Sequence, residues 1–102
     1  MQEEKLFIDS ELSLKQLAAH IQLHPNKLSW LLNNHFGKNF NDFINAYRLE
    51  YFKQIALKQE NKNITLLGLA YDSGFNSKTV FNTFFKKETG MTPKQWVKQN
   101  TL

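Results

Sequence analysis

Two segments of the chain carry side chains that could read the edges of base pairs. Residues 25–36 and 78–89 each have apolar residues at helical spacing, and the opposite side of each is polar or cationic with almost no carboxylate. Amide, hydroxyl and ammonium groups on a helix held against a core can hydrogen-bond base edges in the major groove of DNA. The candidate base-reading residues are Asn26, Lys27, Ser29, Trp30 and Asn33, followed in the second segment by Lys78, Thr79, Asn82 and Thr83.

A second set of residues could hold phosphate oxygens. Lysine ammonium groups and the free N–H groups at helix N-termini both attract anions. The candidates are Ser13, Lys38, Asn39, Thr65, Lys86, Lys87, Thr92 and Lys94. The net charge is +4, and four of the nine acidic residues fall within the first 13, so the rest of the chain is more basic than the total suggests. This balance suits a polyanionic partner, although a soluble basic domain without one would have the same charge.

The elements that must position these residues occur twice. Leu17-Ala18 recurs as Leu69-Ala70 at an offset of 52, and each pair precedes a short break and a second apolar-periodic segment. Helix start signals stand at Ser13, Pro25, Asn39, Thr65, Ser77 and Thr92-Pro93. They predict helices over residues 14–21, 25–36, 40–58, 66–73, 78–89 and 93–98, with a remnant of a helix at 1–5. Residues 58–63 are predicted to form a polar loop.

The predicted fold is therefore all-α, with about seven helices arranged as two helix-turn-helix lobes joined by a long central linker helix. Residues 1–38 are expected to form the first lobe, 39–59 the linker and 60–102 the second lobe. A linker helix of about 19 residues would span about 28 Å. Successive major-groove segments on one side of a duplex are about 34 Å apart, so such a rod could place both reading helices in adjacent turns.

Other chemistries have weak support. His20, His24 and His35 are interrupted by Pro25 and do not form a metal-ligand set, and there is no cysteine. A chain of 102 residues can bury a core but not the deep cleft of a hydrolase or metal enzyme, so we expect no catalysis, cofactor or metal. No apolar run approaches the roughly 18 residues of a membrane span. We therefore infer a reducing cytosol, that is, a cytoplasmic location.

Arg48 is the single arginine of the chain and falls in the middle of the predicted linker helix. We interpret it as structural, paired with a carboxylate or with carbonyl groups at the interface between the lobes, with a DNA contact as the less favoured alternative. The bidentate arginine–guanine contact is therefore absent from both reading helices. Asparagine amides suit adenine and threonine methyl groups suit thymine, so we predict a preference for steps that contain A·T pairs.

The residue pattern resembles the DNA-binding domain of the AraC/XylS family of bacterial transcription regulators, over roughly residues 12–98. The resemblance depends most on the run Leu69–Ser77, then Phe81, Phe84-Phe85-Lys86-Lys87, Gly90 and Thr92-Pro93, and in the first half on Leu17-Ala18, Leu28, Phe36-Gly37, Phe40, Phe43 and Arg48-Leu49. It implies sequence-specific binding of double-stranded DNA in adjacent major grooves. It also implies a sensor or dimerisation region N-terminal to this chain, which sets dimerisation or presents the second lobe to RNA polymerase.

Carried over by position, the resemblance assigns base reading to Asn26, Ser29, Trp30, Lys78, Thr79, Asn82 and Thr83. The chain departs from the family pattern at His24, where a serine cap is usual, and at Trp30 and Thr83, where a basic base-reading residue is common. Gly68 replaces a better helix former. Two alternatives remain at this point: a helical module whose exposed Trp30 and asparagine faces bind another protein, and an RNA-binding domain, although RNA-stacking platforms on strands are missing.

Overall fold

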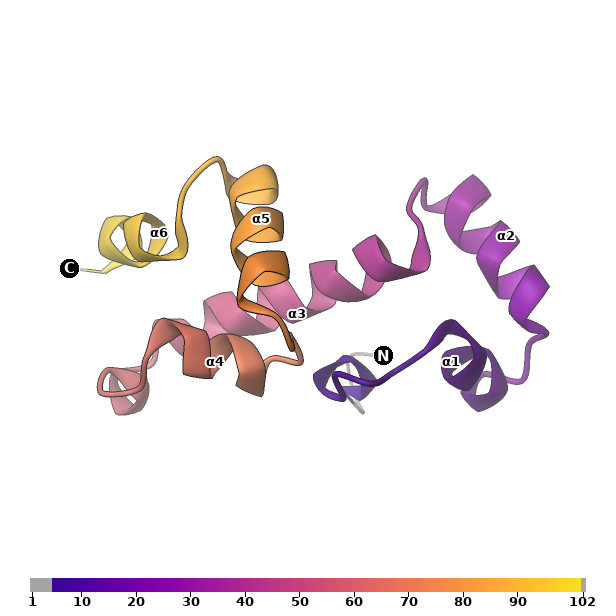
Figure 1. Cartoon of the computed structure of the whole chain (residues 1–102), viewed down its shortest axis with the longest axis horizontal. Coiled ribbons are helices and arrows are strands. Elements are labelled where there is room, and N and C mark those ends of the chain that lie inside the picture. The colour runs from indigo at the N-terminus through magenta and orange to yellow at the C-terminus, as the bar shows by residue number, and fades with distance from the viewer. Residues whose placement is uncertain (1–4, 102) are drawn as a thin grey trace.

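The computed structural model describes residues 5–101, and within that range the chain is all-helical (Figure 1). The α-helices are α1 (Leu14–His20), α2 (Pro25–His35), α3 (Phe40–Ala56), α4 (Leu66–Asp72), α5 (Lys78–Thr89) and α6 (Pro93–Asn100), and two 3₁₀ helices are η1 (Leu6–Ile8) and η2 (Gln59–Asn61). The predicted all-α architecture is confirmed. The helix remnant expected at residues 1–5 lies outside the described residues except for Lys5, which has a left-handed backbone and precedes η1.

Each α-helix begins directly after a residue whose side chain caps its N-terminus. The side chains of Ser13, His24, Asn39, Thr65, Ser77 and Thr92 each accept a hydrogen bond from a backbone N–H in the first turn. Ser13 and Thr92 form complete capping boxes with a glutamine three residues later. His24 replaces the usual serine by accepting from the Asn26 N–H through Nδ1 at 3.1 Å. Local side-chain chemistry thus defines where both reading helices start.

The central helix α3 ends earlier than its apolar pattern suggests. The sequence predicts a helix to Lys58, whereas α3 stops at Ala56 and the following loop contains η2. The side-chain amide of Asn61 donates to the Ile55 carbonyl at 2.9 Å and so satisfies one of the carbonyls exposed at the helix end. Its 17 residues give α3 a length of about 26 Å at about 1.5 Å per residue.

Two apolar cores lie along α3. The first combines η1, α1, α2 and the start of α3, with Phe7, Leu17, Ala18, Leu28, Leu32 and Ile44 buried. The second combines the remainder of α3 with α4, the turn after it and α5, with Leu49, Phe52, Ile55, Leu69, Ala70, Phe75, Phe81, Phe84 and Phe85 buried. The side chain of Trp96 on α6 packs at the edge of the second core and is only partly buried. Since α3 contributes to both cores, it fixes each lobe to the same rod.

One residue of the predicted buried face is exposed. Helical spacing predicts Phe36 on the buried face of the helix at residues 25–36 with Leu28, Leu31 and Leu32, but 53% of its surface is open to solvent. It follows the last residue of α2, and its ring packs against Phe43 with centroids 5.4 Å apart, at the margin of the first core.

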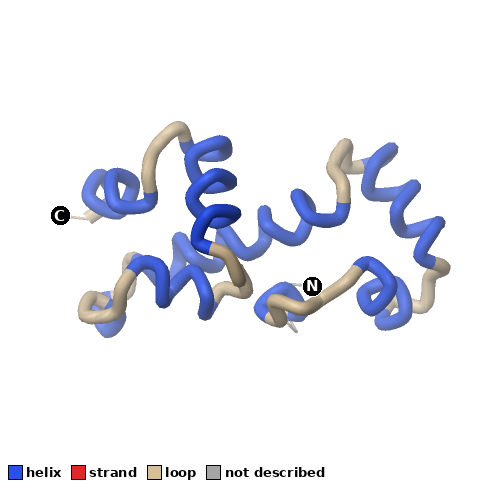
Figure 2. Tube along the Cα trace, in the orientation of Figure 1, coloured by secondary structure: helices blue, strands red, loops and turns tan. Residues whose placement is uncertain are grey.

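The arrangement gives an elongated molecule of 45 × 25 × 21 Å. Figure 1 shows α2 beyond the start of α3 and α5 crossing α3 toward its other end, and both helices run from the lower to the upper part of the view. The short turns that join each pair of helices are visible as tan segments in Figure 2. The two candidate reading helices are therefore held apart by α3 and do not bury their faces against each other.

Candidate nucleic-acid interface

The polar face of α2 is open to solvent. Leu28 and Leu32 point into the first core, and this leaves the candidate readers outside: Asn26, Lys27, Trp30 and Asn33 are exposed and Ser29 is partly exposed. Trp30 exposes 61% of its surface, so it does not pack against the second lobe. A large apolar ring held out among amide and ammonium groups is available for contact with a partner.

The two asparagines at the end of this face are already engaged with their own helix. The Nδ2 group of Asn33 donates to the Ser29 carbonyl at 2.9 Å, and that of Asn34 donates to the Trp30 carbonyl at 2.9 Å. Within residues 5–101, no hydrogen bond uses the side-chain amide of Asn26. The two asparagines predicted to read bases from α2, Asn26 and Asn33, therefore differ in what their amides can offer to a base.

The corresponding face of α5 is also exposed. Phe81, Phe84 and Phe85 are buried on one side, and the candidate readers on the other side are all solvent-exposed: Lys78, Thr79, Asn82 and Thr83. Helical spacing predicts Glu88 on the core side of α5 near its end, and there it is exposed, because the buried residues of this helix end at Phe85. The Glu88 carboxylate lies one residue before the helix end, away from the reading residues of the first two turns.

The candidate phosphate contacts lie at the edges of these faces. Lys38, Lys86, Lys87 and Lys94 are exposed, as are the capping residues Ser13, Asn39, Thr65 and Thr92. Each capping side chain accepts from the N–H of the third helical residue, which leaves the N–H groups of the first two residues without a partner inside the helix; in α6 only the second has one, because Pro93 has no N–H.

A shallow hollow of about 240 Å³ brings base-reading and phosphate candidates together in the second lobe. Its polar lining comes from Lys78 and Asn82 on α5 and from Thr92 and Lys94 at the start of α6. The ammonium groups of Lys78 and Lys94 create a local positive field at this hollow, because no carboxylate among the lining residues offsets their charge.

Arg48 does not belong to either reading face. Its Nε donates to the Phe7 carbonyl at 2.7 Å and its second guanidinium nitrogen donates to the Asp9 carbonyl at 3.0 Å, while the third bond goes to the Asn45 side chain at 3.0 Å. Partial burial lowers the pKa of the Arg48 guanidinium below its usual value, and the nearby Asp9 carboxylate opposes this shift. The predicted pairing of Arg48 with carbonyl groups is confirmed.

Comparisons with known proteins assign the family. A sequence model described as a helix-turn-helix domain matches residues 17–99. An uncharacterised HTH-type transcriptional regulator of Staphylococcus aureus strain COL is 32% identical over 92 residues, which is 90% of this chain and 12% of the relative. The C-terminal domain of the two-component response regulator yesN from Fusobacterium nucleatum superposes with a TM-score of 0.73 at 33% identity, covering 92% of this chain and 88% of that one. The chain belongs to the AraC-type helix-turn-helix family.

The fold of this AraC-type domain is also seen in a more distant structure. The C-terminal domain of AraT, a response regulator from Geobacillus stearothermophilus, superposes with a TM-score of 0.79 at 24% identity, covering 96% of this chain and 78% of that chain. The chain spans 12% of the length of the staphylococcal relatives it matches. Family membership assigns to the domain the function of DNA binding through helix-turn-helix motifs.

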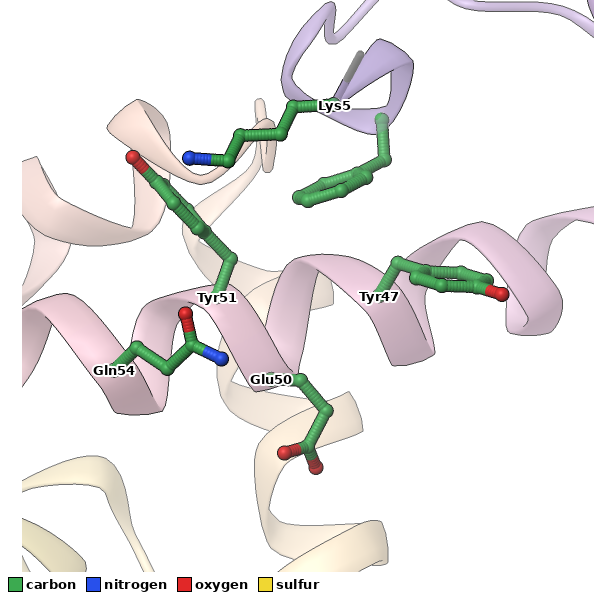
Figure 3. Close-up of a pocket in the computed structure, with 6 residues that line it drawn as sticks. Lys5, Tyr47, Glu50, Tyr51 and Gln54 are labelled. Carbon is green, nitrogen blue, oxygen red and sulfur yellow. The ribbon is translucent and has the colours of Figure 1, made fainter. Parts of the chain in front are cut away.

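The AraC-type domain has one further hollow next to its N-terminal segment. It measures about 220 Å³ and is lined by Lys5 and Phe7 on one side and by Tyr47, Glu50, Tyr51 and Gln54 of α3 on the other. Figure 3 shows the Lys5 side chain reaching across toward Tyr51, and its ammonium group is 4.9 Å from the centre of that ring. The lining offers aromatic packing and one carboxylate, with no cluster of nucleophiles or metal ligands.

No group of histidines and carboxylates that could hold a metal ion occurs among residues 5–101. In the same part of the chain, no helix combines the length and the apolar character that crossing a bilayer requires.

Sequence reasoning placed Gly74 in the turn between the two helices of the second unit but assigned it no contact. Its φ is +108°, and a Cβ atom there would collide with the Phe7 carbonyl oxygen and approach Arg48 Nε to 2.7 Å. The signal in the sequence was a glycine directly after a helix, which indicates a backbone turn but not a long-range contact.

Proposed function

We propose that this domain binds double-stranded DNA sequence-specifically, with α2 and α5 in successive turns of the major groove. The supporting observation is that the second helix of each unit has an exposed polar face, and that α2 and α5 lie toward opposite ends of α3 (Figure 1). The proposed function is binding and includes no covalent chemistry. Residues 1–38 and 60–102 would act as the reading lobes, with residues 39–59 as the spacer between them.

The chemistry of the exposed side chains suggests which residues contact bases and which contact phosphates. Base edges are read by Asn26, Lys27, Ser29, Trp30, Asn33, Lys78, Thr79, Asn82 and Thr83. Phosphates are held by Ser13, Lys38, Asn39, Thr65, Lys86, Lys87, Thr92 and Lys94. Since no arginine lies on either face, amide–adenine and methyl–thymine contacts favour sites that contain A·T pairs.

Selection from random duplexes at fixed salt tests this function. The wild-type domain should enrich a site with two conserved segments, and Asn26→Ala and Thr83→Ala should each remove base preference in a different segment, about one helical turn apart. Asn63→Ala and Thr101→Ala are matched controls, because they remove the same groups from exposed positions outside α2 and α5. Enrichment of sites made only of G·C pairs would contradict the proposed readout.

Salt dependence separates DNA binding from the alternative of a protein-binding module. With about six phosphate contacts, log K should fall with log salt at a slope of about −5. A protein partner recognised through Trp30, which exposes 61% of its surface, and the neighbouring amides would give a much flatter dependence. A flat dependence on duplex DNA would count against phosphate-based binding.

The wider protein is part of the proposal. We infer a cytoplasmic regulator in which a region N-terminal to these residues controls dimerisation and the second lobe is presented to RNA polymerase. Sedimentation of a longer chain that includes the preceding region, with and without DNA, tests the first point. Pull-down of purified RNA polymerase by the DNA-bound domain tests the second.

A further inference from the structure

The two lobes touch at a second point besides α3. The η1 segment packs in the first core through Phe7, whose ring lies 5.8 Å from that of Tyr47 and 5.9 Å from that of Tyr51. The backbone of the same segment faces Gly74, in the turn that leads from α4 into α5. A segment of the first lobe therefore lies directly against the turn of the second helix-turn-helix unit.

Arg48 fixes this contact from α3. Its guanidinium donates to the carbonyls of Phe7 at 2.7 Å and Asp9 at 3.0 Å, and its position is set by the bond to Asn45, which is 8% exposed. These three bonds use the planar fork of the arginine side chain, which lysine cannot reproduce. We call the contact of Arg48, the Phe7 carbonyl and Gly74 the interlobe clasp.

The clasp requires the turn at Gly74 to lie directly against the backbone of η1. Gly74 has no side chain, and a Cβ atom at its position would collide with the Phe7 carbonyl oxygen and lie 2.7 Å from Arg48 Nε and 3.1 Å from the Ile8 Cα. The turn can approach the first lobe this closely because Gly74 has a φ of +108°, which side-chain-bearing residues rarely adopt. Four residues after Gly74, α5 begins at Lys78.

We propose that the interlobe clasp sets the distance and rotation between α2 and α5, and thereby the spacing between half-sites that the domain accepts. This inference rests on the proposed function, in which both helices read one duplex. One base pair changes the separation of two half-sites by about 3.4 Å and their rotation by about 34°. A linker helix packed into both lobes allows small rolling motions about its axis, and a contact away from that axis restricts them. Arg48 is thus a positioning residue for recognition and touches no base.

A spacing series tests the proposal. Duplexes carry the selected half-sites separated by the preferred distance and by one or two base pairs more or fewer. The wild-type domain should lose about tenfold or more in affinity at two base pairs from the optimum, because one helix loses its base contacts. Arg48→Met and Gly74→Ala should reduce that penalty to less than about threefold, with the base preferences inside each half-site unchanged. Arg48→Lys keeps a single donor nitrogen, and its spacing penalty should lie between those of the wild type and Arg48→Met.

Lys53→Met is the matched control, because it removes one positive charge from the same helix at a residue that contacts Glu50 and the Trp96 ring instead of the clasp. It should keep the wild-type spacing profile. Urea unfolding of every variant shows whether each remains folded. An Arg48→Met domain that binds more weakly by the same factor at every spacing would overturn the proposal and leave Arg48 with a role in stability or charge alone.

A measurement without DNA keeps the inference separate from the proposed function. The chain contains no cysteine, so spin labels at Asn34→Cys on α2 and Lys87→Cys on α5 are the only labels present. Pulsed dipolar spectroscopy should give one narrow distance distribution, broadened or shifted by Arg48→Met and Gly74→Ala but not by Lys53→Met. If neither substitution changes the distance distribution, the inference about the clasp is wrong. If the distribution broadens but the domain binds no duplex, the clasp is supported and the proposed function is rejected.

Discussion

Replacing Asn26 and Asn33 with alanine, one at a time, should affect base discrimination unequally. Both are asparagines on the exposed face of α2, and both are predicted to read adenine. Bidentate recognition of adenine uses the amide oxygen and the amide N–H together. The Asn33 amide already donates to the Ser29 carbonyl at 2.9 Å, whereas the Asn26 amide has no hydrogen bond within residues 5–101.

The expected difference in base discrimination follows from the hydrogen bond between the Asn33 amide and the Ser29 carbonyl. A good bidentate contact discriminates against the wrong base by about 1–3 kcal/mol. If Asn33 has to give up its bond to Ser29 in order to turn toward a base, its contribution falls by about 1 kcal/mol, the net value of an ordinary hydrogen bond. The Asn26→Ala domain should therefore lose about fivefold more discrimination at its base pair than the Asn33→Ala domain at its own.

Competition binding measures both effects at one salt concentration, with every base pair of the selected site replaced in turn. Asn34→Ala is the control for helix stability, because Asn34 makes the same type of bond, to the Trp30 carbonyl at 2.9 Å. Equal unfolding midpoints for Asn33→Ala and Asn34→Ala would show that the comparison concerns recognition. A larger loss of discrimination for Asn33→Ala than for Asn26→Ala would refute the reasoning.

Three further predictions concern stability and are measured by urea or thermal unfolding. Phe52→Ala should cost about 3–5 kcal/mol, because the ring is fully buried and lies 4.9 Å from that of Phe81; a cost below about 1 kcal/mol would mean that the core closes around the gap. Gly68→Ala should gain less than the roughly 1 kcal/mol expected from helix propensity, because the added Cβ would lie 3.0 Å from the capping oxygen of Thr65. His24→Ala should cost about 1 kcal/mol and His24→Ser should not, since serine restores a capping oxygen; equal stability of the two variants would show that the His24 bond contributes nothing.

The helix starts were predictable from sequence because capping is local. Ser13 with Gln16, and Thr92 with Gln95, bind across three residues, so residue types alone identify them. The end of α3 was not predictable in the same way. No glycine or proline follows it, and the residue that satisfies the Ile55 carbonyl is Asn61, six positions away on the other side of a turn.

The reading faces were predictable for a related reason. Helical periodicity gives the direction in which each side chain points, and the core lies opposite the polar face in both α2 and α5. Periodicity does not tell how far along the helix the core extends. Phe36 and Glu88 both fall on the core side by helical spacing, but each lies at the end of its helix and both are exposed, although the Phe36 ring still contacts Phe43 of α3.

The contact between the lobes carries almost no signal in the sequence, and the reason is chemical. Arg48 binds carbonyl oxygens 39 and 41 residues away, and every residue presents such an oxygen, so the types of Phe7 and Asp9 say nothing about this role. Only Gly74 is restricted by type, because any Cβ there would meet the Phe7 carbonyl. It follows that Phe7 and Gly74 should respond differently to substitution. Removing the Phe7 ring weakens the first core, whereas a methyl group at Gly74 removes no core side chain and acts first on how closely the turn approaches the first lobe.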